Sequence, residues 1–281
     1  MKLAVTGLDG FTGIHLKPLA QAQGFSVVSI DADIRNTSAL SIALESASAD
    51  FVIHLAGLSF VAHLDTAALY EVNTIGTFNL LQALAALEKR PQKVLIASSA
   101  TVYGNATDAP ISELTIPQPT NHYAMSKFAA EMLAKNFIDK LNIVVARPFN
   151  YTGPGQSPLF LVPKLVEHFR QHAPSIQLGN LDVEREFNDV RMVCESYLSL
   201  LRSEVRTGCF NICSGRVYKL GHVLSIIGEL TNHSIDVLVD PAHVRSDEVK
   251  SLCGDPARLT AAIGALAPYT LEDTLHWMLK S

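Results

Sequence analysis

The chain has few charged residues and no excess of positive ones. Of its 281 residues 17% are charged, and 22 Lys and Arg stand against 27 Asp and Glu, so the formal net charge is −5. Proteins that bind nucleic acids or anionic membrane surfaces typically carry basic runs or a basic balance, and this chain has neither. We therefore expect no nucleic-acid or membrane partner. Any anionic ligand must be held by a few individually placed cations.

Cysteine and long apolar runs are also scarce. The four cysteines lie in the last third without a Cys-x-x-Cys pair, so we expect free thiols, no disulfide framework and no metal site. No apolar run approaches the roughly 18 residues of a membrane span. The short apolar start Met1 to Val5 is followed at once by polar and glycine residues, unlike a signal peptide. We predict a cytoplasmic protein.

What the chain does have is 48% apolar residues, arranged in alternating strand-like and helix-like segments. The strand-like runs are apolar throughout, which indicates strands covered on both faces. Alternating strands and helices predict an α/β fold, a Rossmann-type doubly wound parallel sheet that binds ligands at the carboxyl ends of its strands. The predicted strands are Lys2–Thr6, Ser26–Ile30, Phe51–Leu55, Val94–Ala97 and Asn142–Ala146, and the clearest helices are Thr12–Gln23, Ala67–Leu87 and Tyr123–Lys140.

A glycine-rich segment, Gly7-Leu8-Asp9-Gly10-Phe11-Thr12-Gly13, follows the first strand and opens a helix. Glycines there permit a tight turn and close approach to a pyrophosphate, and the helix N-terminus offers free N–H groups. Asp31 ends the second strand, where a carboxylate accepts hydrogen bonds from ribose hydroxyls and repels a 2′-phosphate. This favours NAD(H). A solvated Asp31, with Arg35 attracting the phosphate, is the alternative and leaves NADP(H) possible.

One Tyr-x-x-x-Lys pair occurs, Tyr123 with Lys127. Positions four apart share a helix face, so we expect the ammonium to lower the phenol's pKa from about 10. Such a tyrosine exchanges a proton with an alcohol or carbonyl oxygen near neutral pH. Ser98 and Ser99 follow the strand that ends at Ala97. We expect Ser99 to hold the reacting oxygen and Ser98 to bond the backbone.

Together these features resemble the extended short-chain dehydrogenase/reductases that modify nucleotide sugars, and more narrowly the GDP-4-keto-6-deoxy-D-mannose reductases, also called GDP-6-deoxy-D-mannose dehydrogenases. The resemblance covers almost the whole chain. It departs at Tyr151, where His is frequent, at Asn188, where Thr is frequent, and at Ser246-Asp247, which replaces a Pro-containing pair. Beyond the motifs above, it rests on residues 54–57, 147–156, 179–181, 185–190, 210–215 and 240–255.

The resemblance also implies binding residues. For the cofactor these are Gly7, Gly10, Phe11, Thr12, Gly13, Asp31, Asp33, Ile34, Leu55, Ala56, Gly57, Tyr123, Lys127 and Pro148. For the substrate they are Ser59, Ser99, Asn150, Arg185, Arg245 and Glu248. Arg185 and Arg245 are the candidates to bind a diphosphate. Alternatively, these arginines form surface or interface salt bridges, Asn150 is a turn residue and Ser59 a plain loop serine. His54 is expected to be a hydrogen-bonded core residue, and Asn73 to support an active-site water network.

The chain changes character after Asn150, where Gly and Pro residues introduce shorter mixed elements. We predict a Rossmann domain over residues 1–150 and a smaller α/β substrate-binding region over 151–281, with segments that return to the main sheet. The helix at 67–87 is apolar beyond a single stripe. We therefore predict a homodimer that pairs this helix and the helix at 123–140 with their symmetry mates.

The predicted function is reduction of the 4-keto group of a nucleoside-diphosphate 4-keto-6-deoxyhexose. Among such sugars the GDP-linked one is favoured as the substrate. Tyr123 would supply the proton, Ser99 would polarise the carbonyl and Lys127 would bind the nicotinamide ribose. A sugar-nucleotide 4-epimerase is the alternative. A dehydratase requires a further carboxylate where this chain has Ala100 and Thr101, which do not ionise. A catalytically silent regulator would need a broken triad, and this triad is intact.

Overall fold

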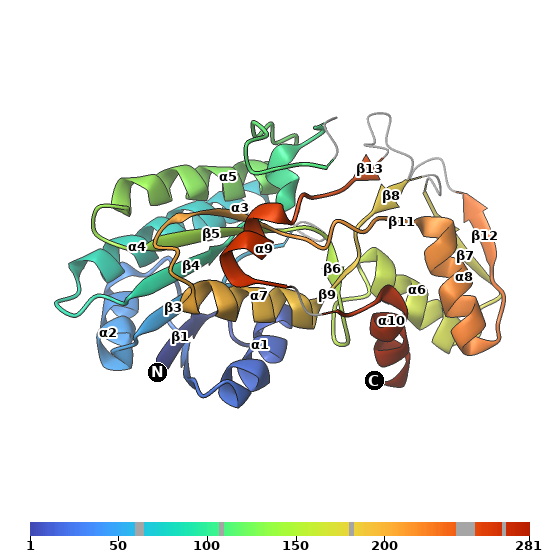
Figure 1. Cartoon of the computed structure of the whole chain (residues 1–281), viewed down its shortest axis with the longest axis horizontal. Helices are drawn as coiled ribbons and strands as arrows, with labels where there is room; N and C mark the ends of the chain where they lie inside the picture. Colours follow the sequence, from blue (N-terminus) through green and yellow to red (C-terminus); the bar gives the residue numbers. More distant parts are fainter. Residues whose placement is uncertain (60–64, 107–109, 180–182, 240–250, 266–267) are drawn as a thin grey trace.

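The computed structural model describes residues 1–59, 65–106, 110–179, 183–239, 251–265 and 268–281 (Figure 1). Within these ranges a six-stranded sheet has the order β10-β5-β4-β3-β1-β2, and every neighbouring pair is parallel. This confirms the predicted Rossmann-type sheet. Its strands are β1 Lys2–Thr6, β2 Ser26–Ile30, β3 Phe51–His54, β4 Lys93–Ala97, β5 Ile143–Pro148 and β10 Gly208–Ile212.

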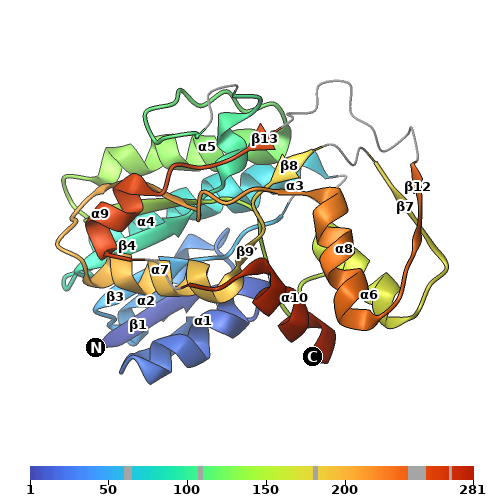
Figure 2. The ribbon, with the colours of Figure 1, turned by 45° about the vertical axis from the view of Figure 1, so that its right-hand side comes forward.

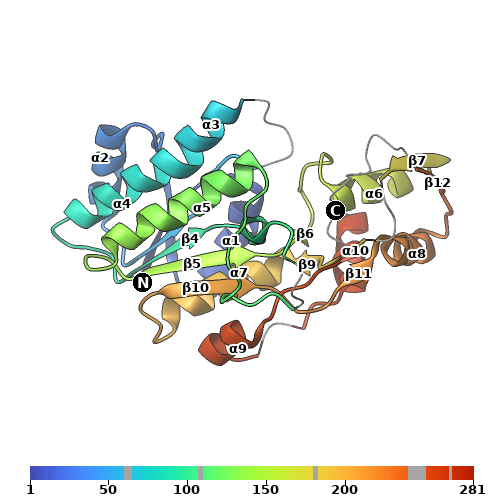
Figure 3. The same cartoon turned by 90° about the horizontal axis from the view of Figure 1, so that it is seen from above.

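Helices cover both faces of this sheet, which is why its strands are apolar on both sides (Figure 3). On one face Leu16 and Tyr197 pack against Leu3 and Val5, and on the other Leu40 and Leu80 pack in a second cluster with Ala4 and Val52. The first face carries α1 Phe11–Ala22, α7 Val190–Arg202 and α9 Ala257–Ile263. The second carries α2 Thr37–Ala47, α3 Thr66–Tyr70, α4 Thr77–Ala86 and α5 His122–Ala134.

Two predicted helices have different limits in the structure. The segment predicted as one helix over 67–87 contains a π-helical stretch, η1 Glu71–Gly76, between α3 and α4. The helix predicted to reach Lys140 ends at Ala134 and continues as a short 3₁₀ turn, η3 Lys135–Phe137. A further 3₁₀ turn, η2 Ala100–Tyr103, follows β4. Hydrophobic periodicity does not distinguish α from π geometry, so η1 could not be predicted from the apolar pattern.

The second half of the chain builds a smaller lobe at the opposite end of the molecule from α2 (Figures 1 and 2). Its core is formed by α6 Leu161–Arg170, α8 Leu220–Thr231 and α10 Leu271–Lys280 around the parallel pair β7 Ser175–Leu178 and β12 Asp236–Val239. In α6 the buried residues Val162, Leu165, Val166 and Phe169 follow the spacing of one helix face. The other strands are β6 Tyr151–Thr152, β8 Glu184–Arg185, β9 Asn188–Asp189, β11 Tyr218–Lys219 and β13 Ser251–Leu252.

The second half also returns to the main sheet, where β10 pairs with β5 and α7 packs against α1. The exact division at residue 150 stays a prediction. The chain leaves β2 and crosses β1 to form β3, so the strand order reverses at β1 and β3. In open α/β sheets ligands bind in the crevice at the carboxyl ends of the strands beside this reversal.

Candidate active site

The glycine-rich segment between β1 and α1 needs glycine for steric reasons. Gly7 has a φ of +71°, and a Cβ there would lie 2.7 Å from the backbone nitrogen of Ala56. A Cβ on Gly13 would lie 2.2 Å from the carbonyl oxygen of Leu8. The segment therefore packs directly on the backbone that follows β3 and on its own turn. It keeps open a cradle beside the N-terminus of α1, the kind of site that takes a phosphate.

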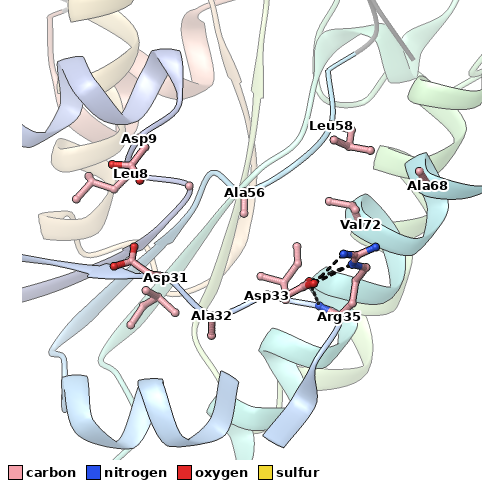
Figure 4. A pocket seen from close by; sticks show the side chains of 13 residues that line it. Leu8, Asp9, Asp31, Ala32, Asp33, Arg35, Ala56, Leu58, Ala68 and Val72 are labelled. Carbon is pink, nitrogen blue, oxygen red and sulfur yellow. Dashed lines mark hydrogen bonds and ion pairs between the residues drawn. The ribbon is translucent and has the colours of Figure 1, made fainter. Parts of the chain in front are cut away.

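A cavity of about 610 Å³ opens from this cradle along the ends of β1, β2 and β3 (Figure 4). Five of the fourteen predicted cofactor residues line it, namely Gly7, Asp31, Asp33, Ile34 and Ala56. The other nine do not. Ile34 is 6% exposed, and its side chain packs on Gly76 of η1, where a Cβ would lie 2.5 Å from Ile34 Cδ1. The cavity has the size and the polar end groups expected for a nucleotide-containing ligand.

The charged groups at the β2 end of this cavity are arranged in pairs. Ser29 Oγ donates a hydrogen bond to Asp31, whose carboxylate lies at the cavity wall (Figure 4). Arg35 Nη2 donates to Asp33 Oδ2 at 2.7 Å, and Arg35 Nη1 lies 3.9 Å from Glu71. This pairing lowers the pKa of Asp33 to about 2. The guanidinium of Arg35 is thus already held by two carboxylates, while the carboxylate of Asp31 lies at the cavity wall.

His54, at the end of β3, is 2% exposed and is held by two threonines. Thr77 Oγ1 donates to the Asn73 carbonyl at 2.6 Å, so it must accept from His54 Nε2 at 2.9 Å. His54 Nδ1 then accepts from Thr6 Oγ1 at 2.7 Å. Burial, aided by the nearby Lys127 ammonium, lowers the pKa of His54 to about 3. His54 is therefore a neutral core residue, as the sequence indicated, that joins β1 and β3 to the helix carrying Asn73.

A pH dependence of stability follows from His54. Its pKa is about 3 when folded and near 6.5 when unfolded, so below pH 6.5 the unfolded chain binds the extra proton and stability falls as pH falls. Between pH 7 and pH 5 we expect the parent to lose roughly 2 kcal/mol of unfolding free energy relative to His54→Gln. Urea unfolding of both proteins at each pH measures this. Parallel pH dependences in the two proteins contradict it.

The π-helical stretch η1 aims two polar side chains at α5. Asn73 Nδ2 donates to Ser126 Oγ at 3.0 Å, and Thr74 Oγ1 donates to the Ser126 carbonyl at 2.9 Å. Asn73 Oδ1 accepts from Leu58 N at 2.8 Å. A Cβ on Gly57 would lie 3.0 Å from Asn73 Oδ1 and 3.1 Å from Lys127 Nζ, closer than an ordinary van der Waals contact, so both groups pack against this glycine. Asn73 thus fixes the loop after β3 against the helix that carries Tyr123 and Lys127.

The structure brings Ser99, Tyr123 and Lys127 together at the ends of β4 and α5. Ser99 caps η2, its Oγ accepting from Thr101 Oγ1 at 2.9 Å, and its hydroxyl also hydrogen-bonds Tyr123. Lys127 Nζ donates to the Ala97 carbonyl at 2.9 Å. A phenol, a hydroxyl and an ammonium therefore lie close together, and Lys127 Nζ lies against Gly57, between the cavity-lining residues Ala56 and Leu58. This is a set that can deliver a proton to a carbonyl oxygen.

Two sequence-based expectations about this cluster are wrong. Burial raises the pKa of Tyr123, and the group that lowers it is the Ser99 hydroxyl rather than the Lys127 ammonium. Lys127 is turned toward Ala97, and burial lowers its pKa to about 8, an effect that Glu131 partly offsets. Ser98 does not bond the backbone with its hydroxyl. Its Oγ donates to Glu131 Oε1 at 2.5 Å.

The predicted substrate residues lie on separate segments of the chain, and none of those that the structure describes lines the cavity described above. Asn150 follows β5 with an exposed side chain, and its carbonyl accepts from Asn188 N at 2.8 Å and Nδ2 at 3.2 Å. Ser59 is exposed in the loop after β3. Arg185 lies in β8, where its Nη1 donates to the Glu184 carbonyl at 2.8 Å. Arg245 and Glu248 lie outside the described residues.

Several polar contacts were missed by sequence reasoning because they join distant segments. Tyr151, at the position where His is frequent, pairs its hydroxyl with Thr12 Oγ1 at 2.8 Å and stacks on Phe11. Glu186 is 1% exposed and accepts from Gly254 N at 2.6 Å and Ser214 N at 2.8 Å. The predicted cofactor residue Pro148 ends β5 opposite Ile212 of β10. A pattern within one short segment of the sequence does not predict contacts of this kind.

The described part of the chain holds neither a cluster of metal-binding side chains nor a membrane-spanning helix. No group of three or more His, Cys, Asp or Glu side chains within it is arranged to hold a metal ion. None of its helices has the length and apolar character needed to cross a bilayer. The four cysteines, Cys194, Cys209, Cys213 and Cys253, are free thiols in the structure.

Comparison with known proteins gives consistent matches over nearly the full chain. The family model described as GDP-mannose 4,6 dehydratase matches residues 15–278. The chain is 35% identical over 269 residues to GDP-6-deoxy-D-talose 4-dehydrogenase of Aggregatibacter actinomycetemcomitans, covering 94% of this chain and 92% of that protein. It is 35% identical over 294 residues to GDP-6-deoxy-D-mannose reductase of Pseudomonas aeruginosa, covering 99% and 96%. The solved structure of RMD from Pseudomonas aeruginosa with NADPH has a TM-score of 0.92 at 33% identity, covering 99% of this chain and 97% of that one.

Proposed function

The chain belongs to the GDP-mannose 4,6-dehydratase family of extended short-chain dehydrogenase/reductases, and we propose that within it the protein is a nicotinamide-dependent 4-ketoreductase of a GDP-linked 4-keto-6-deoxyhexose. The observation that carries this proposal is the Ser99, Tyr123 and Lys127 cluster beside the cavity. The two relatives at 35% identity, named as a 4-dehydrogenase and a reductase of GDP-6-deoxyhexoses, support the same chemistry.

The glycine cradle fits a dinucleotide, because Gly7 lines the cavity and no side chain caps the N-terminus of α1 at Gly10, where backbone N–H groups can bind a pyrophosphate. When bound, the reduced nicotinamide supplies the hydride. Tyr123 then donates its proton to the sugar's 4-oxygen, and its raised pKa keeps it protonated at neutral pH, as an acid requires. The Ser99 hydroxyl, which lowers the pKa of Tyr123 against the effect of burial, would polarise the same oxygen, and Lys127 would orient the ribose.

The dehydratase activity after which the family model is named is disfavoured in this chain. That reaction needs a carboxylate beside Ser99, and η2 instead carries Ala100, which is 3% exposed, and Thr101, which bonds Ser99. A sugar-nucleotide 4-epimerase is the second candidate, since the same fold and triad can serve either reduction or epimerisation. Reduction is favoured over epimerisation by the names of the two relatives at 35% identity, which cover over nine-tenths of the chain.

A substrate panel tests the proposal. The purified protein is incubated with reduced cofactor and GDP-4-keto-6-deoxymannose, with the dTDP- and UDP-linked 4-ketohexoses, and with unmodified GDP-mannose and UDP-glucose. We expect oxidation of the cofactor, followed at 340 nm, with the GDP-linked keto sugar and none with the unmodified hexoses. Equal rates with all three nucleotides would contradict the GDP assignment.

We propose that NADH is preferred, with NADPH as the weaker ligand. Asp31 faces the cavity and repels a 2′-phosphate, and Arg35 is held by Asp33 and Glu71. We expect Asp31→Asn to tighten NADPH binding about tenfold, which corresponds to about 1.4 kcal/mol. Asp9→Asn, at the glycine end of the same cavity, is the control. It is expected to change the affinities for NADH and NADPH by the same factor. Tighter binding of NADPH than NADH by the parent in a fluorescence titration contradicts this preference.

We further propose a homodimer in the cytoplasm. Most of the apolar surface of residues 67–87 is buried inside the chain, with Leu80, Leu81 and Leu84 at most 1% exposed. These leucines pack within the protomer and are not available to a dimer interface. Two apolar side chains of the proposed interface helices stay exposed, Ile75 of η1 at 50% and Met125 of α5 at 46%. The free thiols are in keeping with a reducing compartment.

Light scattering tests the dimer. At micromolar concentration we expect twice the 30.5 kDa mass of the chain, and a monomer when Ile75 and Met125 are both changed to Glu. Ile42→Glu, at a position 69% exposed on α2, is the matched control and is expected to stay dimeric. A parent of single-chain mass rules the dimer out.

A further inference from the structure

A buried carboxylate lies directly behind the proposed chemical centre. Glu131 is 4% exposed and sits on α5, one helical turn beyond Lys127. Its Oε1 accepts from Ser98 Oγ at 2.5 Å and from Arg147 Nε at 2.9 Å, and its Oε2 accepts from Arg147 Nη2 at 2.5 Å. The side chain of Arg147 is only 6% exposed. This fork-shaped pairing, with Ser98 added, is geometrically the most restrictive kind of ion pair.

These three residues come from the three elements that carry the proposed site. Ser98 follows β4 and precedes Ser99. Arg147 is in β5, just before Pro148 and Asn150. Glu131 is on α5 with Tyr123 and Lys127. One carboxylate therefore joins the ends of two neighbouring strands to the helix that lies over them.

Apolar packing between α5 and β5 is incomplete beside this ion pair. A cavity of about 530 Å³ lies against the outer side of the pair, between α5, β5 and β10, and it is lined by Phe128, Met132 and Val145 as well as by Glu131 and Arg147. Where side chains leave such a space, contact between helix and strand is incomplete. The polar cluster is then a direct link between α5 and the ends of both strands, beside the contact of Lys127 Nζ with the Ala97 carbonyl of β4.

From this geometry we propose that Glu131 is a positioning residue, whose carboxylate clamps the ends of β4 and β5 to α5 and so sets the spacing among Ser99, Tyr123 and Lys127. The inference rests on the proposed reductase function for its kinetic consequences. The spacing of Ser99, Tyr123 and Lys127 can itself be measured without any activity. Small displacements of reacting groups cost large factors in rate, so a loosened clamp lowers turnover.

The charged and titratable groups around the clamp define its electrostatic effect. Lys127 faces Glu131 from α5, Arg147 from β5 and Cys209 from β10. Tyr103 of η2 lies against Arg147, whose guanidinium is 4.8 Å from the centre of the Tyr103 ring. His54 lies beyond Lys127 on β3. Glu131 raises the pKa of Lys127 against the effect of burial. Removing the carboxylate therefore lets Lys127 lose its proton at lower pH.

Two variants test the clamp without leaving a buried charge unpaired. Ser98→Ala removes one hydrogen bond and keeps the ion pair. The double variant Glu131→Gln with Arg147→Met removes both charges at similar volume, a change that buried ion pairs often tolerate. The matched control is Lys93→Met, which removes a buried charge from the opposite end of β4, where Lys93 Nζ donates to the Leu200 and Ser203 carbonyls.

We expect kcat to fall about tenfold or more in both clamp variants, with the melting temperature of the double variant no lower than that of the control. The basic limb of the kcat/KM profile is expected to move to lower pH in the double variant and to stay in place in Ser98→Ala and Lys93→Met. Crystal structures of the clamp variants are expected to show that the Ser99 to Tyr123 hydrogen bond, or the 2.9 Å contact from Lys127 Nζ to the Ala97 carbonyl, is lengthened or lost.

The two possible failures are distinguishable. A parent enzyme with no activity on the keto sugar overturns the proposed function, and the crystal structures alone then decide the clamp. Triads that superimpose on the parent's in both variants overturn the clamp, whatever the activity. So does a kcat within twofold of the parent in both variants, or a loss in Lys93→Met as large as in the double variant.

Discussion

Replacing Tyr123 with phenylalanine is expected to lower turnover at least about 100-fold, the scale of a lost general acid. The Ser99 hydroxyl bonds Tyr123, and burial keeps the phenol protonated, so no other group in this cluster is as well placed to deliver the proton. Phenylalanine keeps the ring and its packing. We therefore expect KM for the cofactor, measured with the keto sugar at saturation, to change less than threefold, because the lost interaction is made only in the transition state.

Tyr269→Phe is the control for this measurement. It also removes one hydroxyl, which donates to Glu195 on α7 at 2.9 Å, and it is expected to leave kcat within twofold of the parent. Retention of more than half the activity by Tyr123→Phe would remove the tyrosine from the mechanism and with it the assignment of the triad.

Changing Gly13 to alanine is expected to be the most damaging single-methyl substitution in the cofactor region. The new Cβ would lie 2.2 Å from the Leu8 carbonyl oxygen and 2.6 Å from Leu8 Cα, and backbone atoms cannot swing aside as a flexible side chain does. Overpacking of a core typically costs about 1 to 3 kcal/mol, and we expect about 3 kcal/mol of unfolding free energy here. Because the clash pushes α1 from its turn, dinucleotide affinity is expected to fall at least tenfold.

Gly221→Ala serves as the matched change. Gly221 lies in the first turn of α8 with no heavy atom within 4 Å of the built Cβ, so its unfolding free energy is expected to stay within about 1 kcal/mol of the parent. Urea unfolding and NADH titration of both variants make the comparison. Equal stabilities of the two would show that the loop after β1 relaxes freely, contrary to the tight packing of Gly13.

The sheet was predictable from sequence because its strands are continuous apolar runs with polar ends. Lys2–Thr6 and Ser26–Ile30 are the observed limits of β1 and β2, and β3 differs from its prediction by one residue. Burial on both faces leaves a strong local pattern. Helix limits were less predictable, since the π-helical stretch Glu71–Gly76 is set by contacts of Asn73 and Thr74 with α5.

The candidate site was predictable in its motifs and not in its electrostatics. Spacing along the chain brought out Tyr123 and Lys127, but it does not reveal that Lys127 Nζ turns to the Ala97 carbonyl, or that burial outweighs a neighbouring charge. Glu131 and Arg147 were missed for a related reason. Their pairing joins residues 16 apart across a helix and a strand, and such a contact leaves no mark in either segment alone. The roles of the predicted binding residues stay predictions.

The stoichiometry of the cofactor tests the reductase proposal most directly. Cofactor-free protein is mixed with GDP-4-keto-6-deoxymannose and a measured amount of NADH, and the oxidised cofactor and the sugar product are quantified together. We expect one NADH consumed per keto sugar converted, with no reaction when NADH is left out. Conversion of an unmodified nucleoside-diphosphate hexose into its carbon-4 epimer, with no net consumption of added cofactor, would contradict reduction and establish an epimerase.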